Sequence, residues 1–490
     1  MQCHSLQSHI VDSSFFRAGY STDEARRVFC DFRRLQRWLD VEVALAISQA
    51  NLGMIPLSAA EELEQTGQLS LFDLKEISDS IASTGHSLIP LLNGWHKVTP
   101  PAAARYIHYG ATTQDIQDTA QSLEVKEILS FVERDLCQII KELISLARQY
   151  RDMVIVGRSH GQHALPTTLG LKVAVWLDEM IRNGERLHEC MKRVLVSQLF
   201  GGVGTMAAFK GQGLVLLEEF SKRLKLSPAR TAWHAARDRQ AELLSFMAIL
   251  GGGLGKIANE ICQLARNEIC ELEEPFHLGK IGSTTMPHKR NPELCEQVVV
   301  LARLIKSNTV AGYDALINEH ERDYRSIRLE WVSIPECSQF LCSALRLMRS
   351  ILKNLIVHEQ NIAANLQESA CQVSTEALMF RLSDITGKQA AHKLLYELSM
   401  QAYSSNRPLQ ELLEEHPEIC NKLDPALLAE LLNPANHIGA ARELTARSIT
   451  AAEEWLATNR QPDLSANVCP LAGNDGECSI SMDGLPEGNI

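Results

Sequence analysis

A short segment in the second half of the chain places a hydroxyl group close to a cation and an amide. Its sequence is Gly282-Ser283-Thr284-Thr285-Met286-Pro287-His288-Lys289-Arg290-Asn291-Pro292. The glycine and prolines disfavour a helix here and favour a mobile loop. Such a loop can present Ser283 to a substrate while Lys289 and Asn291 hold a carboxylate. An ordinary connection with solvated basic residues explains the same composition, because short motifs also arise by chance.

Two further segments carry side chains that can bind a carboxylate or move a proton. In residues 108–119, Thr112 and Thr113 precede an expected helix. Their hydroxyls can bind a substrate carboxylate or simply cap that helix. In residues 157–168, His160 can act as a general acid near neutral pH, although most histidines in loops are structural polar groups. The residues alone leave both interpretations open for each segment.

Taken together, the three segments resemble the fumarase/aspartase superfamily. The loop matches the superfamily signature GSSxMPxKxN at every fixed position except the second serine, which is Thr284 here. The resemblance covers roughly residues 10–460 and is closest to the branch that contains adenylosuccinate lyase and 3-carboxy-cis,cis-muconate cycloisomerase. It implies four catalytic residues, which are Ser283 as the base, His160 as the general acid, Glu273 as the partner of His160, and His86.

The resemblance implies removal of a proton next to a carboxylate, followed by loss of a group from the neighbouring carbon. Because such a carbon acid is weak, fixed donors and a cation must stabilise the dianionic intermediate. Ser283 becomes a base only if backbone N–H groups and Lys289 favour its ionised form. The reaction needs no cofactor or metal, and the sequence offers no metal-ligand spacing. The implied substrate-binding residues are His108, Thr112, Thr113, Gln114, Met286, Lys289, Asn291 and Arg322.

Within this branch the sequence divides between two activities. His86 and His160 match adenylosuccinate lyase, whereas residues 87–90, 200–202, 233–239 and 319–331 resemble the cycloisomerase. Near the positions that bind the AMP phosphate in adenylosuccinate lyase, this chain has Arg328 and Trp331, which disfavours AMP as the leaving group. The sequence therefore predicts a carbon–nitrogen lyase that releases fumarate from a succinyl-type substrate. The alternatives are a lactonising cycloisomerase, adenylosuccinate lyase itself, and a structural relative without activity.

Composition excludes several other classes of protein. The 490 residues include 60 acidic and 48 basic side chains, for a net charge of -12. Without a dense Lys/Arg stripe, this balance argues against binding to nucleic acid. No apolar run reaches 18 residues, so no membrane span is expected. Thirteen cysteines without a CxxC pair, and an N-terminus without signal-peptide features, predict a cytoplasmic protein with reduced thiols.

The side chains named above must be positioned by helices. Leu250, Leu254, Ile257, Ile261 and Leu264 step by four and three residues, which is typical of a helix packed against another helix. Segments 169–189 and 296–312 are apolar on nearly every side, which predicts deep burial. The fold prediction is all-α, and the resemblance implies three domains whose long central helices form a twenty-helix bundle in a homotetramer with shared active sites. The predicted domains are 1–108, 109–365 and 366–460, followed by a disordered tail, 461–490.

Overall fold

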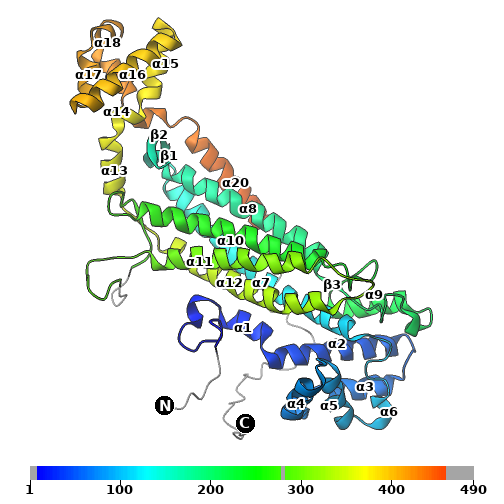
Figure 1. The fold of residues 1–490 in the computed structure, drawn as a ribbon. Helices are drawn as coiled ribbons and strands as arrows, with labels where there is room; N and C mark the ends of the chain where they lie inside the picture. Colours follow the sequence, from blue (N-terminus) through cyan, green and yellow to red (C-terminus); the bar gives the residue numbers. More distant parts are fainter. Residues whose placement is uncertain (1–7, 277–281, 460–490) are drawn as a thin grey trace.

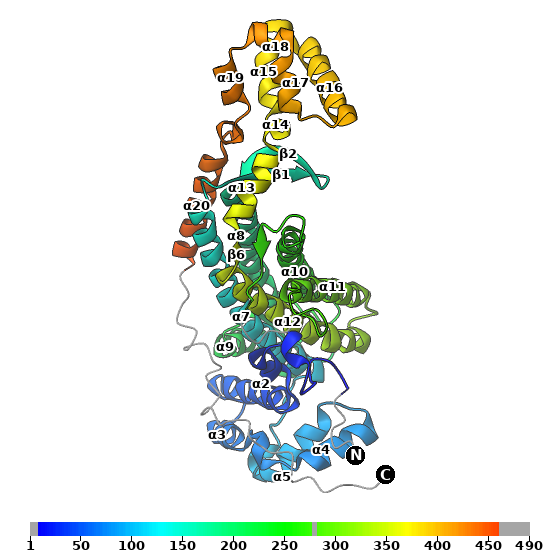
Figure 2. The ribbon, with the colours of Figure 1, turned by 90° about the vertical axis from the view of Figure 1, so that its left-hand side faces the viewer.

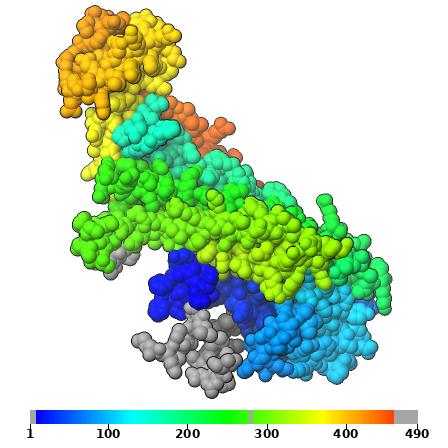
Figure 3. Space-filling model, viewed as in Figure 1, coloured from blue at the N-terminus to red at the C-terminus, as the bar shows by residue number. Residues whose placement is uncertain are grey.

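The fold is all-α, as predicted. The computed structural model describes residues 8–276 and 282–459, so the predicted tail, 461–490, lies outside the described residues. Figures 1 and 2 show an elongated molecule in which a group of N-terminal helices, a bundle of long helices and a group of C-terminal helices follow one another. The space-filling view has the same outline (Figure 3).

The N-terminal group consists of short helices around an aromatic and aliphatic core that includes Leu39, Leu63 and Trp95. This core also takes in α9 and the start of α7, so it extends past residue 108. The elements are η1 (Arg17–Gly19), α1 (Asp23–Phe29), α2 (Asp31–Asn51), α3 (Leu57–Thr66), η2 (Leu69–Leu71), α4 (Leu74–Thr84), α5 (Ile89–Val98), α6 (Pro101–Ala104), η3 (Ala207–Phe209) and α9 (Gly213–Leu224).

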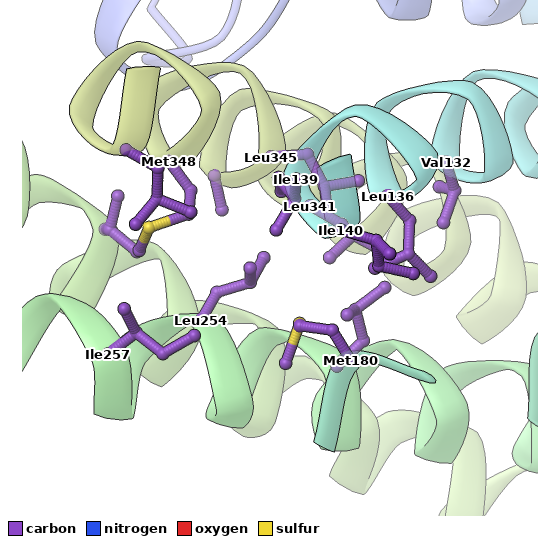
Figure 4. Close-up of a cluster of buried hydrophobic side chains, with 14 of the residues drawn as sticks. Val132, Leu136, Ile139, Ile140, Met180, Leu254, Ile257, Leu341, Leu345 and Met348 are labelled. Atoms are coloured by element: carbon purple, nitrogen blue, oxygen red, sulfur yellow. The ribbon is translucent and has the colours of Figure 1, made fainter. Parts of the chain in front are cut away.

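Five long helices form the central bundle, and α20 packs against α8 on its surface. They are α7 (Thr113–Gln149), α8 (Leu169–Val194), α10 (Asp238–Leu264), α11 (Glu293–Asp314), α12 (Tyr324–Lys353) and, outside them, α20 (Ala441–Thr458). Figure 4 shows side chains from four of these helices meeting in one core, among them Leu136, Met180, Leu254 and Leu341. Helix α7 begins beside α2 and runs to the opposite end of the bundle (Figure 1).

Helix α10 confirms the predicted apolar seam, because all five seam residues are buried. Its glycines allow close approach to neighbouring helices: a Cβ at Gly255 would lie 2.8 Å from the Ala302 Cβ. Within the described residues, α10 is long and apolar enough to cross a membrane, but 67% of its most apolar window is buried inside the protein. The seam packs against other helices of the same chain.

The predicted deep burial of residues 169–189 and 296–312 is wrong for a single chain. These segments lie in α8, which packs against α7, α10 and α20, and in α11, which packs against α10 and α12, and each helix keeps some apolar side chains exposed. Val175 is 56% exposed, and Val310 is 57% exposed. Apolar composition predicted burial, but it could not say whether the same chain or another one covers each face.

In the described part of the chain, three two-stranded sheets connect the ends of the long helices. They pair β1 (Val154–Ser159) with β2 (Gln162–Thr168), β3 (Val196–Ser197) with β4 (Ser227–Pro228), and β5 (Leu272–Glu273) with β6 (Ile356–Val357). Beyond the first sheet lies a separate C-terminal core with residues from Cys371 to Leu432. Its elements and their connections are α13 (Glu359–Glu368), α14 (Ala370–Val373), α15 (Thr375–Thr386), α16 (Lys388–Ser405), α17 (Leu409–Glu415), α18 (Pro417–Lys422), α19 (Pro425–Leu431) and η4 (Pro434–His437).

Candidate active site

The predicted site residues lie at two opposite ends of the bundle. One group surrounds the N-terminus of α7 and comprises His86, His108, Thr112, Thr113, Gln114 and Arg322. The other follows the far end of the bundle and comprises His160, Glu273, Ser283, Met286, Lys289 and Asn291. Helix α7 has 37 residues and separates the two groups. At a rise of 1.5 Å per residue this helix is about 55 Å long. One chain therefore does not bring its own two groups together.

The Ser283 loop folds back on itself in the structure. Ser283 Oγ accepts hydrogen bonds from the backbone N–H groups of Met286 at 3.1 Å and Thr285 at 3.4 Å. Asn291 Nδ2 donates to the Gly282 carbonyl oxygen at 2.6 Å, which joins the two ends of the loop. A Cβ at position 282 would lie 2.1 Å from the Lys289 carbonyl oxygen, so only glycine fits there.

This loop geometry suits Ser283 as a base and gives Asn291 a structural part in the loop. Two N–H donors aimed at one hydroxyl oxygen favour its anionic form. The Lys289 ammonium is exposed, and it has no hydrogen-bond or ion-pair partner among the described residues. Met286, at 42% exposure, also faces outward. Asn291 donates a hydrogen bond to the backbone and shapes the loop, and its contact with substrate stays a prediction.

Glu273 does not hold His160 within one chain. One oxygen of its carboxylate accepts from Arg290 Nη1 at 3.0 Å, and the other lies 3.0 Å from His358 Nε2. Both contacts follow from the position of Glu273 in β5, because β5 pairs with β6 directly before His358. Within one chain Glu273 therefore anchors the Ser283 loop to the sheet, and its predicted pairing with His160 stays a prediction for the assembled protein.

His160 lies at the exposed tip of the β1–β2 hairpin rather than in an irregular loop. His160 and Gly161 form a two-residue turn with positive φ angles of 54° and 76°. Such turns fit the twist of a hairpin. No partner of the His160 ring is found in the described part of the chain, whereas His163 Nδ1 lies 2.5 Å from Ser369 Oγ. The hairpin thus exposes the imidazole of His160, whereas the imidazole of His163 is held by Ser369.

At the opposite end of the bundle, Thr112 and Thr113 begin helix α7. Thr112 is the N-cap residue, and its N–H donates to Asp115 Oδ2 at 3.0 Å, as the capping interpretation requires. Its hydroxyl oxygen also accepts a hydrogen bond from Arg322 Nη1. A helix N-terminus and a guanidinium at one position form a favourable place for a carboxylate. Thr112 can therefore both cap the helix and take part in binding a carboxylate.

His86 is fixed by the start of α5. Its Nδ1 accepts from the N–H groups of Leu88 at 3.3 Å and Ile89 at 3.1 Å, so the neutral ring carries its proton on Nε2. The neighbouring Ser87 Oγ lies 3.0 Å from Tyr324 Oη and accepts from Gln117 Nε2 at 2.7 Å. These bonds join α5, α7 and α12. Sequence reasoning missed Gln117 and Tyr324, because only long-range contacts connect them.

His108 is paired with a buried carboxylate. Its Nδ1 lies 2.6 Å from Glu42 Oε1, and its backbone has a left-handed φ of 56°. Burial is the largest single influence on the pKa of His108 and lowers it. The charge and hydrogen bond of Glu42, with the charge of Asp115, together outweigh burial and raise this pKa above its usual value. Glu42 therefore favours a charged imidazolium beside Thr112.

Replacing Glu42 with glutamine is expected to lower the pKa of His108, measurable by NMR titration. Because this pKa is raised in the folded protein, the charged ring stabilises the fold below about pH 6.5, and that contribution disappears as the pH rises through the folded-state pKa. Each unit by which the pKa of His108 falls corresponds to about 1.4 kcal/mol in the free energy of folding. The variant should therefore lose more stability near pH 6 than near pH 9. The matched control is Glu61→Gln, at an exposed position of α3. Equal losses of stability at both pH values would contradict the pairing of His108 with Glu42.

A buried polar network lies beneath the threonine pair, and Gln114 belongs to it. Gln114 is 2% exposed, and its Nε2 donates to Asp118 Oδ2 and to the His234 carbonyl oxygen, each at 3.1 Å. Gln114 is therefore a support for α7, and its predicted contact with substrate is corrected. Arg237 lies at the centre of the network, where it bonds Asp118 at 2.9 Å and Glu330 at 2.7 Å.

Comparisons with known proteins agree with this description. The family model described as Lyase matches residues 17–306, and the model described as Adenylosuccinate lyase C-terminus matches residues 372–448. An N-acetyl-S-(2-succino)cysteine lyase from Dickeya dadantii is 39% identical over 89% of this chain and 96% of its own length. An adenylosuccinate lyase from Pyrococcus abyssi is 39% identical over 89% of this chain and 97% of its own length.

The fold has solved counterparts as well. The 3-carboxy-cis,cis-muconate lactonizing enzyme from Pseudomonas putida superposes with a TM-score of 0.84 at 33% identity, covering 90% of this chain and 100% of that chain. The lyase family model alone matches more than half of the chain. With these relatives matching nearly its whole length, the chain belongs to the fumarase/aspartase superfamily.

Proposed function

We propose that this chain catalyses a β-elimination that releases fumarate from a small 2-succino adduct. The Ser283 hydroxyl, which accepts from two backbone N–H groups, is the observation that carries the proposal. The favoured substrate is a thioether of the N-acetyl-S-(2-succino)cysteine type, because a relative with that activity in its name shares 39% identity over nearly the full chain. The carbon–nitrogen lyase predicted from the sequence is the second candidate, because an adenylosuccinate lyase is equally similar.

The proposed reaction assigns one step to each group. Ser283 removes a proton from the carbon next to a carboxylate, while Thr112, Arg322 and Lys289 bind the substrate carboxylates and stabilise the charge that develops there. The bond between the neighbouring carbon and sulfur then breaks, and His160 protonates the departing sulfur. A thiol has a pKa of about 8.5, so it leaves as an anion far more readily than an amine does.

An aromatic surface supports a leaving group without a phosphate. The Arg328 guanidinium lies 4.7 Å from the Tyr324 ring centre and 5.8 Å from that of Trp331. Trp331 in turn lies 6.0 Å from Trp38. The resemblance to adenylosuccinate lyase would place the AMP phosphate near Arg328 and Trp331. The rings offer a phosphate few donors beyond the Arg328 guanidinium, so we favour a smaller leaving group at this surface.

In this proposal a complete active site contains residues from more than one subunit. Because α7, which is about 55 Å long, separates the two groups of site residues within a subunit, Thr112 of one subunit must meet His160 and Ser283 of others. We propose a cytoplasmic homotetramer in which three subunits complete each site, without a metal, a cofactor, nucleic acid or a membrane. The exposed apolar side chains of α8 and α11, among them Val175, Val300 and Val310, support such contacts.

The proposal is tested by incubating the purified protein with three substrates and measuring fumarate. N-acetyl-S-(2-succino)cysteine should yield fumarate fastest, adenylosuccinate should yield it slowly, and 3-carboxy-cis,cis-muconate should remain unchanged. Faster cleavage of adenylosuccinate would favour the carbon–nitrogen lyase. Consumption of the muconate without any release of fumarate would support the cycloisomerase instead.

A further inference from the structure

Helices α10 and α11 are antiparallel, and their register brings two cysteines face to face. Gly255 of α10 lies against Ala302 of α11, since a Cβ at position 255 would lie 2.8 Å from the Ala302 Cβ. Moving seven residues, or about two helical turns, from each contact residue leads to Cys262 on α10 and Cys295 on α11. The same helix faces therefore bring the two side chains together between α10 and α11, where each thiol affects the pKa of the other. Cys262 and Cys295 therefore form a pair at the contact between the two helices.

The two thiols have different surroundings. Cys295 is fully buried, whereas Cys262 is only partly buried and remains accessible to small molecules. The hydrogen bond from the Cys295 thiol lowers the pKa of Cys262, although burial and the charges of Glu296 and Glu274 oppose this effect. The same hydrogen bond, together with burial, raises the pKa of Cys295. Cys262 is thus the thiol that ionises first and reacts first.

Cys295 lies directly beside the proposed catalytic loop. It belongs to the first turn of α11, three residues after the loop ends at Pro292. Its N–H donates to Glu274 Oε2 at 2.9 Å, and the N–H of Leu294 donates to Glu274 Oε1 at 3.1 Å. Glu274 follows β5 on the other side of the loop. One carboxylate therefore joins the chain before the loop to the helix after it, next to the thiol pair.

We propose that Cys262 and Cys295 form a peroxide-sensitive dithiol whose disulfide restrains the Ser283 loop. The Cys262 thiolate attacks the terminal oxygen of a hydroperoxide, and the O–O bond breaks. The products are Cys262 sulfenic acid and, after protonation, an alcohol or water. The Cys295 thiol then displaces the sulfenic oxygen as water and forms the disulfide. Two thiols lose two electrons and two protons, and the peroxide is reduced by the same two electrons. A small dithiol reverses the change by exchange.

The disulfide is expected to slow the enzyme. A sulfur–sulfur bond of about 2.05 Å is much shorter than a hydrogen bond between thiols, so it draws the first turn of α11 toward α10. The bonds of that turn to Glu274 must adjust, and with them the loop between Gly282 and Asn291. Loop opening and turnover should both become several-fold slower in the oxidised protein and recover after reduction.

Peptide mapping tests the bond without any substrate. The full-length protein is treated with hydrogen peroxide, alkylated and digested with trypsin under non-reducing conditions. Cleavage after lysine and arginine gives one peptide, 257–266, that contains only Cys262, and another, 291–303, that contains only Cys295. We expect these two peptides to be joined, and dithiothreitol to separate them. Cys262→Ser should abolish the joined peptide, whereas Cys420→Ser, at an exposed cysteine in α18, should not.

Limited proteolysis tests the effect on the loop. The rate of the first tryptic cut after Lys289 or Arg290 in the native protein reports loop opening. This rate should fall several-fold on oxidation in the wild type and in Cys420→Ser, but not in Cys262→Ser. Sulfinic acid at Cys262 without the joined peptide would overturn the proposal, and so would the joined peptide with an unchanged cleavage rate. Neither measurement uses a substrate, so failure here is distinct from failure of the proposed elimination.

Discussion

Replacing Ser283 with alanine should lower kcat for fumarate release by about 10²- to 10⁴-fold, the usual contribution of a positioned base. The two N–H groups of Thr285 and Met286 would then have no hydroxyl oxygen to bind, and the carbon acid would have no base. KM should change far less, because the groups proposed to bind the substrate carboxylates remain. Steady-state kinetics with a 2-succino adduct would measure both quantities.

The matched control for this prediction is Thr284→Ala, at the exposed position where the loop departs from the superfamily signature. It removes a neighbouring hydroxyl from the same loop, and its turnover should stay within a few-fold of the wild type. Circular dichroism and size-exclusion chromatography should give the same result for both variants and the wild type. Normal turnover in Ser283→Ala would show that another group is the base.

The features that the sequence predicted correctly depend on local patterns. The spacing of Leu250 and Leu254 along α10 determines one apolar face, and Thr112 followed by Asp115 is enough to begin a helix. The glycine and prolines of 282–292 were likewise enough to indicate a loop. In each example the residues that decide the structure lie within a few positions of one another, so a single sequence contains the information.

The features that the sequence did not predict depend on partners far away in the chain. Gln114 bonds the carbonyl of His234 across 120 positions, and Glu273 bonds His358 across 85. Neither partner was indicated by a local pattern. One signal was present nevertheless: residues 113–124 are rich in Gln, Asp and Thr on a helix that must be buried. Such a polar run implies a buried hydrogen-bond network, although it does not say which residues complete it.

The second large effect concerns that network and the stability of the fold. Arg237 is the cation between Asp118 and Glu330, and the side chains of all three are 0% exposed. Burial opposes the charge of Arg237, but the two carboxylates outweigh it and raise its pKa, so the guanidinium stays charged. Arg237→Met keeps much of the volume but leaves two buried carboxylates without a cation. The free energy of unfolding should fall by about 3–5 kcal/mol, the usual cost of breaking a buried ion pair.

Urea unfolding of four variants separates this electrostatic effect from simple loss of packing: Arg237→Met, Arg239→Met, Glu330→Gln, and Arg237→Met combined with Glu330→Gln. Arg239→Met removes the neighbouring arginine, which is only partly buried and also lies over the Trp233 ring, and should cost about 1 kcal/mol or less. Arg237→Met combined with Glu330→Gln removes one of the two uncompensated charges. Because the two residues share one network, the double variant should lose clearly less stability than the two single losses added together. Strict additivity would mean that Arg237 stabilises α7 through its packing, and that the charges beneath Thr112 contribute little to holding it in place.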